Sequence, residues 1–320
     1  MSTTNIAIIG AGQLGSRHLQ GLKKASVPMN IYVLDASEES LAICEQRYNE
    51  IAENKLVEKI LFATQWNTLP ENIDIAIVAT GSKPRCAIIH ELVEKHQCRM
   101  FVLEKFLFPK MSDYDDITKL FQNNQVRAWV NCSRRYFACY QKLRDILDND
   151  GPLTFILEGK NWGLCCNSIH QIDLFAFLSG AKKISFDCSG IDPILYDSKR
   201  AGYIEMTGTI KGVADNGSSL QISSFAEFDG TGKLSIKSQH HCVEIFEGLN
   251  KMIIDGMEEA MNMSYQSDLT GKYVEDLLST HSLSLASYEE SAKLHQQILP
   301  HFLQIYNQLK GIDSDLCPIT

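Results

Sequence analysis

Hydrophobic and polar residues alternate in two different ways along this chain. Up to about residue 128, short apolar runs that fit buried strands alternate with segments whose apolar residues recur at helical spacing. The apolar runs cover residues 6–9, 31–34, 59–63, 73–79, 100–103 and 126–130, and two clear helical segments cover residues 37–52 and 85–95. Strands that alternate with helices predict a doubly wound parallel sheet. A ligand of such a sheet lies at the carboxyl ends of the strands, so the loops there are expected to carry chemistry.

The pattern changes after residue 128. A helical segment over residues 140–147 ends at a strong breaker, residues 148–152. Strand-like runs follow at residues 203–213, 219–227, 234–246 and 251–255, with a hairpin turn at 215–218. Residues 277–309 have a helical pattern that Pro300 should kink or divide.

These patterns predict an α/β chain of two domains. Residues 1–128 are expected to form a Rossmann domain with a doubly wound parallel sheet. Residues 129–320 are expected to form an α+β domain with a large, mainly antiparallel open sheet. The free face of that sheet could cover a substrate or a partner subunit, so a homo-oligomer packed through it is expected.

Composition and charge exclude several kinds of partner. The 320 residues are 44% hydrophobic and 22% charged, which suffices for a buried core. A net charge of −9 disfavours nucleic acid and anionic membrane surfaces, because phosphate groups need clustered Lys and Arg. No apolar stretch reaches the ~18 residues of a spanning helix and no signal peptide precedes the first strand, so a cytoplasmic location is expected.

The cysteines are expected to be reduced thiols. There are 10, they are scattered, and no C-x-x-C motif occurs among them. Neither Cys165-Cys166 nor His240-His241-Cys242 has the ligand spacing of a zinc site, so no metal is predicted.

A glycine motif follows the first apolar run. Gly10-x-Gly12-x-x-Gly15 leads from residues 6–9 into a helical pattern, which is the context in which a dinucleotide binds. Gly10 would allow the tight turn, Gly12 would let the backbone approach a pyrophosphate, and Gly15 would let the helix pack on the sheet. The phosphates would then lie at the helix N-terminus, where the dipole favours negative charge.

Asp35 ends the second apolar run, about 20 residues after the glycines, where an acid would bind the ribose hydroxyls of the cofactor. Its carboxylate would repel a 2′-phosphate, and no arginine follows it over residues 36–38. NAD is therefore favoured over NADP. The alternative interpretation of Asp35 is an ordinary turn residue at a strand end.

Lys105 directly follows the apolar run at residues 100–103, on the rim where a nicotinamide is expected. A lysine there could hydrogen-bond a substrate hydroxyl and handle its proton. The alternative is a surface ion pair with a neighbour such as Glu104.

His170 lies in a second candidate segment, an apolar helix for which Asn167 or Ser168 is the predicted N-cap and Gly180 the predicted stop. Asp173, three residues later, is expected on the same helix face. A histidine titrates near neutral pH and could relay a proton to or from a substrate hydroxyl. A lone histidine on an amphipathic helix is more often structural, so both interpretations stay open.

Together these motifs resemble the Gfo/Idh/MocA oxidoreductases, the group of glucose–fructose oxidoreductase and inositol dehydrogenase. The resemblance spans residues 5–180. It is carried by the glycine motif with Arg17-His18, by Ala79-Thr80 at a strand end, by Glu104-Lys105 and by His170-x-x-Asp173-Leu174. It implies an NAD(P)-dependent enzyme that usually acts on a cyclic polyol, a sugar or a sugar derivative, commonly as a dimer or tetramer. It also implies that Lys105 lies at the reacting centre and that His170 assists proton transfer.

The remaining candidate residues follow from these motifs. Cofactor contacts are predicted for Gly10, Gly12, Gln13, Leu14, Gly15, Asp35, Thr80, Gly81 and Glu104. Substrate contacts are predicted for Arg85, Arg134, Tyr136, Trp162, Asn167 and Asp173, with Arg135, Lys160 and Asn161 as neighbours. Their cations and aromatic faces would suit a sugar that bears a phosphate, carboxylate or nucleotide. The alternative for the stretches around Arg134 and Trp162 is interdomain packing.

Three positions depart from the family pattern. Phe106 replaces the usual proline after the lysine, Cys166 stands where the family has an aspartate four residues before His170, and Arg85 stands where many relatives have a histidine. We therefore predict an NAD-dependent oxidoreductase that transfers a hydride between nicotinamide and a secondary hydroxyl or ketone of a sugar-like substrate. One alternative is a non-catalytic NAD(P)-binding regulator or scaffold. The other is a sugar epimerase or eliminase that recycles bound NAD.

Overall fold

A computed structural model describes residues 3–320, which form two compact units. The first unit comprises the chain up to Phe108 together with residues 112–131 and 264–289. The second comprises residues 109–111, 132–263 and 290–320. The predicted boundary at residue 128 lies close to the crossing after Asn131, but the sequence pattern did not show that residues 264–289 belong with the first unit.

The first unit is built on a seven-stranded sheet with the order β17-β6-β5-β4-β1-β2-β3. Its strands are β1 (Thr4–Ile9), β2 (Met29–Leu34), β3 (Val57–Ala63), β4 (Ile75–Val78), β5 (Met100–Leu103), β6 (Arg127–Val130) and β17 (Ala286–Ser287). The first six pair in parallel, and β17 adds antiparallel to β6. The strand order reverses between β1 and β4, so the loops after these two strands flank the switch point where ligands of doubly wound sheets bind.

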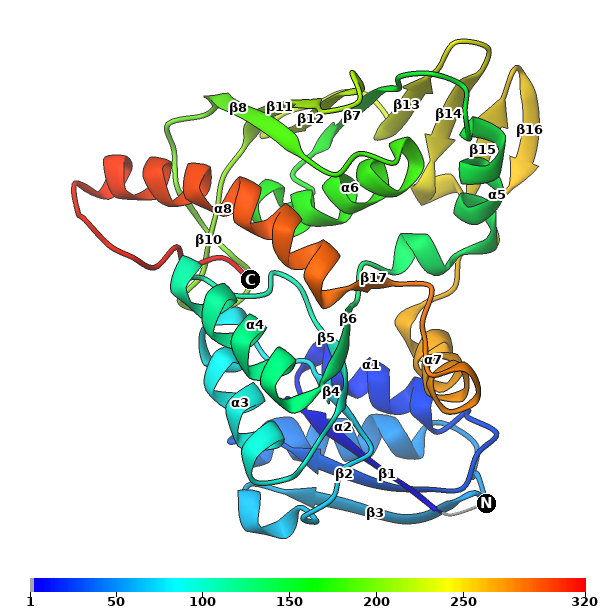
Figure 1. Cartoon of the computed structure of the whole chain (residues 1–320), viewed down its shortest axis with the longest axis vertical. Coiled ribbons are helices and arrows are strands. Elements are labelled where there is room, and N and C mark those ends of the chain that lie inside the picture. The colour runs from blue at the N-terminus through cyan, green and yellow to red at the C-terminus, as the bar shows by residue number, and fades with distance from the viewer. Residues whose placement is uncertain (1–2) are drawn as a thin grey trace. The chain divides into compact units, whose positions relative to one another are not determined.

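Helices cover both faces of this sheet. They are α1 (Gln13–Leu22), α2 (Glu38–Asn49), α3 (Ser82–Glu94), α4 (Met111–Asn124) and α7 (Gln266–Thr280). Figure 1 shows α3 and α4 on one face and α1, α2 and α7 on the other. The helices α1 and α7 approach closely because each has a glycine at the contact. A Cβ added to Gly271 of α7 would lie 2.7 Å from the carbonyl oxygen of Gly21 in α1.

The second unit is built on an eight-stranded sheet with the order β16-β15-β14-β13-β7-β12-β11-β8. Its strands are β7 (Thr154–Lys160), β8 (Ile184–Ile191), β11 (Gly208–Ala214), β12 (Ser219–Phe225), β13 (Lys233–Lys237), β14 (Cys242–Phe246), β15 (Lys251–Ile254) and β16 (Met257–Ala260). All neighbours pair antiparallel except β7 and β12. A small ladder joins β9 (Tyr196–Asp197) to β10 (Ile204–Glu205).

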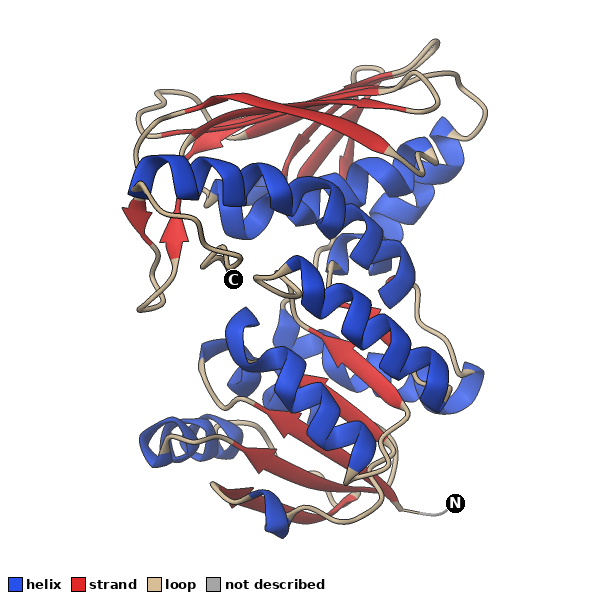
Figure 2. Cartoon of the chain, turned by 60° about the vertical axis from the view of Figure 1, so that its left-hand side comes forward, coloured by secondary structure: helices blue, strands red, loops and turns tan. Residues whose placement is uncertain are grey.

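The helices of the second unit lie on one face of its sheet, as Figure 2 shows. They are α5 (Ala138–Leu147), α6 (Leu164–Ser179) and most of α8 (Tyr288–Lys310). Phe155 of β7 packs edge-on against Phe175 of α6, with ring centroids 5.7 Å apart, which fixes the face that carries the core. The predicted fold class, a Rossmann-type parallel sheet followed by an open and mainly antiparallel sheet, is confirmed.

The C-terminal region differs from its prediction. The helical segment expected over residues 277–309 is the end of α7, a loop, the short strand β17 and then α8. Pro300 lies inside α8 and does not divide it. Its neighbours Leu299 and Phe302 are fully buried, and this packing outweighs the hydrogen bond that the proline removes. Among the described residues, no helix combines the length and apolarity needed to cross a bilayer.

Candidate active site

The loop between β1 and α1 has the geometry that the glycine motif predicts. Gly10 has a φ of +99°, which a side chain would strain. A Cβ on Gly15 would lie 1.7 Å from the carbonyl oxygen of Gly10, whereas a Cβ on Gly12 would meet nothing within 4 Å. The first turn of α1, which includes Gln13 and Leu14, therefore begins beside open space. Because its amides lack partners within the helix, this loop fits the pyrophosphate of a dinucleotide.

Asp35 follows β2 and is tied to the same loop. Its Oδ2 accepts a hydrogen bond from the Ala11 amide at 2.6 Å, and its Oδ1 accepts one from the Ser37 amide at 2.9 Å. A carboxylate has about four acceptor positions, so two remain for the hydroxyls of a ribose. The carboxylate thus fixes the loop and also suits the predicted ribose contact.

Thr80 and Gly81 connect β4 to α3, beside Gly10. The hydroxyl oxygen of Thr80 is buried and has no hydrogen-bond partner among the described residues. Gly81 is the N-cap residue of α3, and no side chain caps this helix N-terminus. A buried hydroxyl without a partner is rare, and a ligand bound at these strand ends would satisfy it.

Arg85 lies in α3, and its side chain is fully buried. Its guanidinium donates hydrogen bonds to the carbonyl oxygens of Thr80 and Phe106 and, at 2.7 Å, to that of Leu107. These contacts hold the loop after β5 to the loop after β4. They contradict the predicted substrate contact of Arg85, because the guanidinium is already committed to backbone carbonyls of the protein.

Glu104 directly follows β5 and is buried, with 3% of its surface exposed. Its Oε1 accepts hydrogen bonds from Asn131 at 2.5 Å and lies 2.9 Å from Nε2 of His18 in α1. Nδ1 of His18 lies in turn 2.9 Å from the hydroxyl of Thr270 in α7. Burial alone would raise the pKa of Glu104, but the bonds from His18 and Asn131 bring this pKa below its ordinary value. Glu104 is therefore a buried carboxylate that joins the end of β5 to α1 and to Asn131, rather than the surface partner of a lysine. Its predicted contact with the cofactor stays a prediction.

Lys105 follows Glu104 directly and is half-buried at the carboxyl end of the sheet. The Lys105–Phe106 peptide bond is cis, and Phe106 is fully buried. The position of Lys105 is thus fixed by its neighbours on both sides, Glu104 in its network and Phe106 in the core.

In the second unit, α6 begins earlier than predicted. The helix starts at Leu164, after Gly163 with a φ of +81°. The Glu205 carboxylate accepts hydrogen bonds from the amides of Cys165 and Cys166, at 2.8 and 3.0 Å. The predicted N-cap at Asn167 or Ser168 is therefore wrong, because the cap comes from a residue distant in sequence. The predicted stop at Gly180 is present, with a φ of +71°.

Two arginines that precede α5 are neutralised by acids. Arg134 donates through Nε and one terminal nitrogen to both oxygens of Glu247, at 2.6 and 2.5 Å. Arg135 binds the fully buried Asp173 at 2.8 Å through two contacts. Asp173 is therefore occupied by Arg135, which argues against its predicted contact with substrate.

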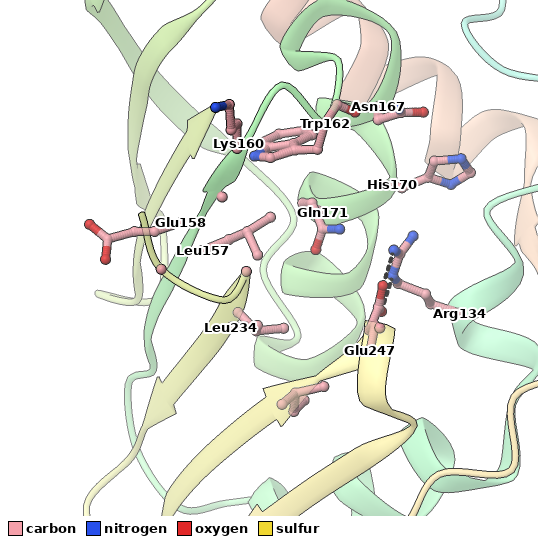
Figure 3. Close-up of a pocket in the computed structure, with 15 residues that line it drawn as sticks. Arg134, Leu157, Glu158, Lys160, Trp162, Asn167, His170, Gln171, Leu234 and Glu247 are labelled. Carbon is pink, nitrogen blue, oxygen red and sulfur yellow. Dashed lines mark hydrogen bonds and ion pairs between the residues drawn. The ribbon is translucent and has the colours of Figure 1, made fainter. Parts of the chain in front are cut away.

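A cavity of about 600 Å³ lies between α6 and the sheet of the second unit. Its lining comprises Arg134, Leu157, Glu158, Gly159, Lys160, Trp162, Asn167, His170, Gln171, Gly230, Gly232, Leu234, Ile245, Glu247 and Gly248. Figure 3 shows Leu157, Leu234 and Gln171 pointing into this space, Trp162 above them, and Glu158 directed away from it. His170 and the Arg134–Glu247 pair lie on the other side in this view. Of the predicted substrate residues, Arg134, Trp162 and Asn167 line the cavity, and Tyr136 and Asp173 do not.

Trp162 forms a rigid wall of this cavity. Its indole nitrogen donates to the carbonyl of Ser223 at 2.7 Å, and its amide donates to the hydroxyl of Ser224 at 3.1 Å. A Cβ on Gly159 would lie 3.1 Å from the indole ring, so glycine is what allows the ring to lie against β7. Asn167 donates to the Trp162 carbonyl at 2.6 Å and fixes the segment between strand and helix.

Gln171 and Glu247 are cavity residues that the sequence patterns did not identify. Gln171 is 6% exposed, and its Oε1 is buried without a hydrogen-bond partner among the described residues. A buried amide oxygen of this kind can accept a hydrogen bond from a ligand hydroxyl. Its only sequence signal is its place four residues after Asn167, on the same helix face. Glu247 follows the strand-like run that ends at residue 246 and carries no signal of its own.

Comparison with known proteins gives one family and many similar folds. Residues 4–132 match the Gfo/Idh/MocA family, an oxidoreductase family with an NAD-binding Rossmann fold. Comparison with curated protein sequences finds no match.

Three solved structures illustrate the shared fold. An oxidoreductase from Agrobacterium radiobacter, in complex with NAD⁺, L-tartaric acid and magnesium, has a TM-score of 0.70 at 14% identity, covering 93% of this chain and 94% of the other. UDP-N-acetylglucosamine 3-dehydrogenase from Acidithiobacillus ferrooxidans has a TM-score of 0.66 at 14% identity, and the match covers 95% of this chain and 97% of the other. Biliverdin reductase from Synechocystis, in complex with biliverdin and NADP⁺, has a TM-score of 0.70 at 12% identity, and the match covers 94% of this chain and 99% of the other.

These identities show a common fold over both units and leave the substrate open. The glycine loop, the Asp35 contact and the family match over residues 4–132 agree with one another. Residues 4–132 of this chain accordingly resemble the Gfo/Idh/MocA oxidoreductases, an oxidoreductase family with an NAD-binding Rossmann fold, as the motifs predicted.

Proposed function

We propose that the protein transfers a hydride between NAD and a secondary hydroxyl or ketone of a sugar-like substrate. The observation that carries this proposal is the cavity beside α6, where an aromatic and aliphatic wall faces amide and imidazole groups. Sugars present apolar C–H faces that stack on an indole and hydroxyls that bind amides. Trp162 and Leu234 supply the apolar surface for the C–H faces of the sugar. Asn167, His170 and Gln171 supply polar groups for its hydroxyls.

The roles of the residues follow from their chemistry. NAD, when bound, accepts or donates the hydride at C4 of its nicotinamide ring. The glycine loop binds the pyrophosphate, and the Asp35 carboxylate binds the ribose hydroxyls. Lys105 holds the substrate hydroxyl and takes or returns its proton at Nζ, and His170 assists this transfer through its imidazole.

The charges favour an uncharged substrate. One arginine and one lysine line the cavity: Arg134 is neutralised by Glu247, and Lys160 lies 2.5 Å from Glu227. An anionic substrate would have to displace Glu247 from a two-point contact, which is costly when the pair is largely desolvated. The sequence-based expectation of an anionic group at the arginines therefore gives way to a neutral sugar, polyol or keto-sugar. A comparison of turnover with a neutral hexose and with the corresponding uronic acid tests this preference.

Asp35→Ala is expected to narrow the preference for NAD over NADP. The substitution removes the ribose hydrogen bonds and the repulsion of a 2′-phosphate, so the ratio of NAD affinity to NADP affinity falls. Calorimetric titration of both cofactors into both proteins measures the change. Equal affinities for NAD and NADP in the unmodified protein would contradict the assigned role.

Trp162→Ala is expected to raise KM for the sugar by about 10-fold, with a smaller effect on kcat, because the indole contributes stacking area rather than a proton. NAD affinity should not change, because Trp162 belongs to the second unit. Trp66→Ala is the matched control, since Trp66 stacks on His96 in the first unit. A KM unchanged in the Trp162 variant would remove this cavity from the substrate site.

The non-catalytic alternative rests on one observation. Cys166, which stands where relatives have an aspartate, has its sulfur 3.8 Å from the carbonyl oxygen of Gly163 in the first turn of α6. A thiol there cannot act as a carboxylate base. Turnover with a neutral sugar would exclude a scaffold, and an altered product at a constant NADH level would favour an epimerase or eliminase. We also propose self-association through the bare face of the second sheet, which light scattering measures.

A further inference from the structure

Three metal-ligating side chains meet between α3 and α4, outside the residues of the proposed site. Cys86 and His90 are four residues apart on α3, so they share one face of that helix. Asp116 lies on α4, which runs beside α3 in Figure 1. One potential ligand atom from each residue lies within 4.8 Å of the others.

The separations of these atoms suit a small cation after modest adjustment. Nε2 of His90 lies 2.9 Å from Oδ2 of Asp116, and the Cys86 sulfur lies 3.5 Å from the same oxygen. Zinc bonds of about 2.0–2.3 Å at tetrahedral angles place ligand atoms roughly 3.3–3.7 Å apart. The side chains of His90 and Asp116 are 31% and 54% exposed, so both can move and an ion can enter from solvent.

A fourth residue orients the histidine. Nδ1 of His90 lies 2.9 Å from a carboxylate oxygen of Glu94, one turn further along α3. A histidine ligand of a metal commonly donates its second ring N–H to a carboxylate, which fixes the ring and its tautomer. With Glu94 on Nδ1, Nε2 is the ring nitrogen of His90 that faces Asp116, and a bound ion would replace the present His90–Asp116 contact.

We propose that Cys86, His90 and Asp116 bind a zinc ion, with Glu94 as the outer partner of the histidine and water in the fourth position. A sulfur and an imidazole ligand favour zinc over magnesium or calcium, which prefer oxygen ligands. The sequence-based prediction of no metal rested on the spacing of Cys165-Cys166 and His240-His241-Cys242. Asp116 lies 26 residues after His90 in sequence, so its approach to Cys86 and His90 appears only when α3 and α4 pack.

The consequence of zinc binding is a link between two helices. Arg85, the neighbour of Cys86, holds the backbone carbonyls that follow Lys105. An ion that bridges α3 and α4 stabilises the first unit around this contact, by an amount that grows with the zinc concentration.

Direct metal binding tests the proposal without reference to activity. The full chain is titrated with Co²⁺, for which a thiolate ligand gives a charge-transfer band in the near ultraviolet, and then with Zn²⁺, which should displace it. We expect one equivalent of Co²⁺ to produce the band and Zn²⁺ to raise Tm. Cys86→Ser should abolish the band, and His90→Gln, Asp116→Asn and Glu94→Gln should each weaken zinc binding by about 10-fold or more.

Cys242→Ser is the matched control. Cys242 is exposed and follows His241, whose Nδ1 lies 2.7 Å from Asp255, so it offers the same three residue types elsewhere on the surface. This variant should bind Co²⁺ and Zn²⁺ as the unmodified protein does. A band that persists in Cys86→Ser, a band that is lost in Cys242→Ser, or an unmodified protein that binds neither ion would overturn the proposal.

Discussion

Gly15→Ala is expected to lower NAD affinity by about 100-fold or more and to lower Tm by several degrees. The added Cβ would lie 1.7 Å from the carbonyl oxygen of Gly10 and 2.8 Å from its carbon. Neither atom belongs to a flexible side chain, so the loop between β1 and α1 must shift, and overpacking of this kind costs about 1–3 kcal/mol. The shift also moves the helix N-terminus away from the pyrophosphate. Calorimetric NAD titration and thermal unfolding measure the two effects.

Gly12→Ala separates cofactor binding from folding. A Cβ on Gly12 meets nothing within 4 Å, so this variant should unfold at the same temperature as the unmodified protein. Its methyl group lies where the backbone approaches the pyrophosphate, and NAD affinity should therefore fall. Normal NAD binding by both glycine variants would refute the assignment of this loop.

Lys105→Ala is expected to lower kcat by about 100-fold or more, while NAD affinity and stability stay nearly unchanged. The reason is that Nζ holds the proton of the substrate hydroxyl, and a positioned acid or base contributes about that factor. His170→Ala should also lower kcat, and the two losses should not multiply if the residues act as a unit. Steady-state kinetics and calorimetry with NAD provide the measurements.

Lys110→Ala is the matched control for Lys105. Lys110 lies five residues further on and forms an exposed ion pair with Asp315, so its loss should leave kcat unchanged. Cys166→Asp restores the carboxylate that relatives carry, and an increase of kcat is expected. Full turnover in Lys105→Ala would show that other groups organise the reaction, and the non-redox alternatives would then take precedence.

The parts of the site that depend on local chain geometry were predictable from sequence. Gly10, Gly12 and Gly15 lie within one turn and helix start, so their spacing alone fixes what each glycine permits. Gly180 ends α6 for the same local reason. The Rossmann sheet was predictable because its strands are apolar on both faces and alternate with helices along the chain.

The parts of the site that depend on partners distant in sequence were not predictable. Arg85 was expected to face a ligand, but it binds the carbonyls of Phe106 and Leu107, 21 and 22 residues away in sequence. Arg134 is neutralised by Glu247 at a separation of 113 residues. No periodicity or motif encodes such pairings, because they arise only when the strands and helices pack.

The C-terminal region shows the same limit. Helical spacing over residues 277–309 correctly indicated helix but could not show the break after Thr280. It also could not show that α7 packs against α1 through Gly21 and Gly271. The hydroxyl of Thr270, which completes the network around His18 and Glu104, enters the first unit only through that packing.

Hydride transfer itself is measured most directly with NADH deuterated at C4. The purified protein is first screened by thermal shift against neutral sugars, keto-sugars and their acidic counterparts, and the keto form of the sugar that stabilises it is then incubated with the labelled cofactor. We predict that mass spectrometry finds deuterium on the carbon of the new hydroxyl of a neutral sugar, with much less transfer by Lys105→Ala. A protein that binds both NADH and a sugar, yet moves no deuterium between them, would contradict the proposed oxidoreductase activity.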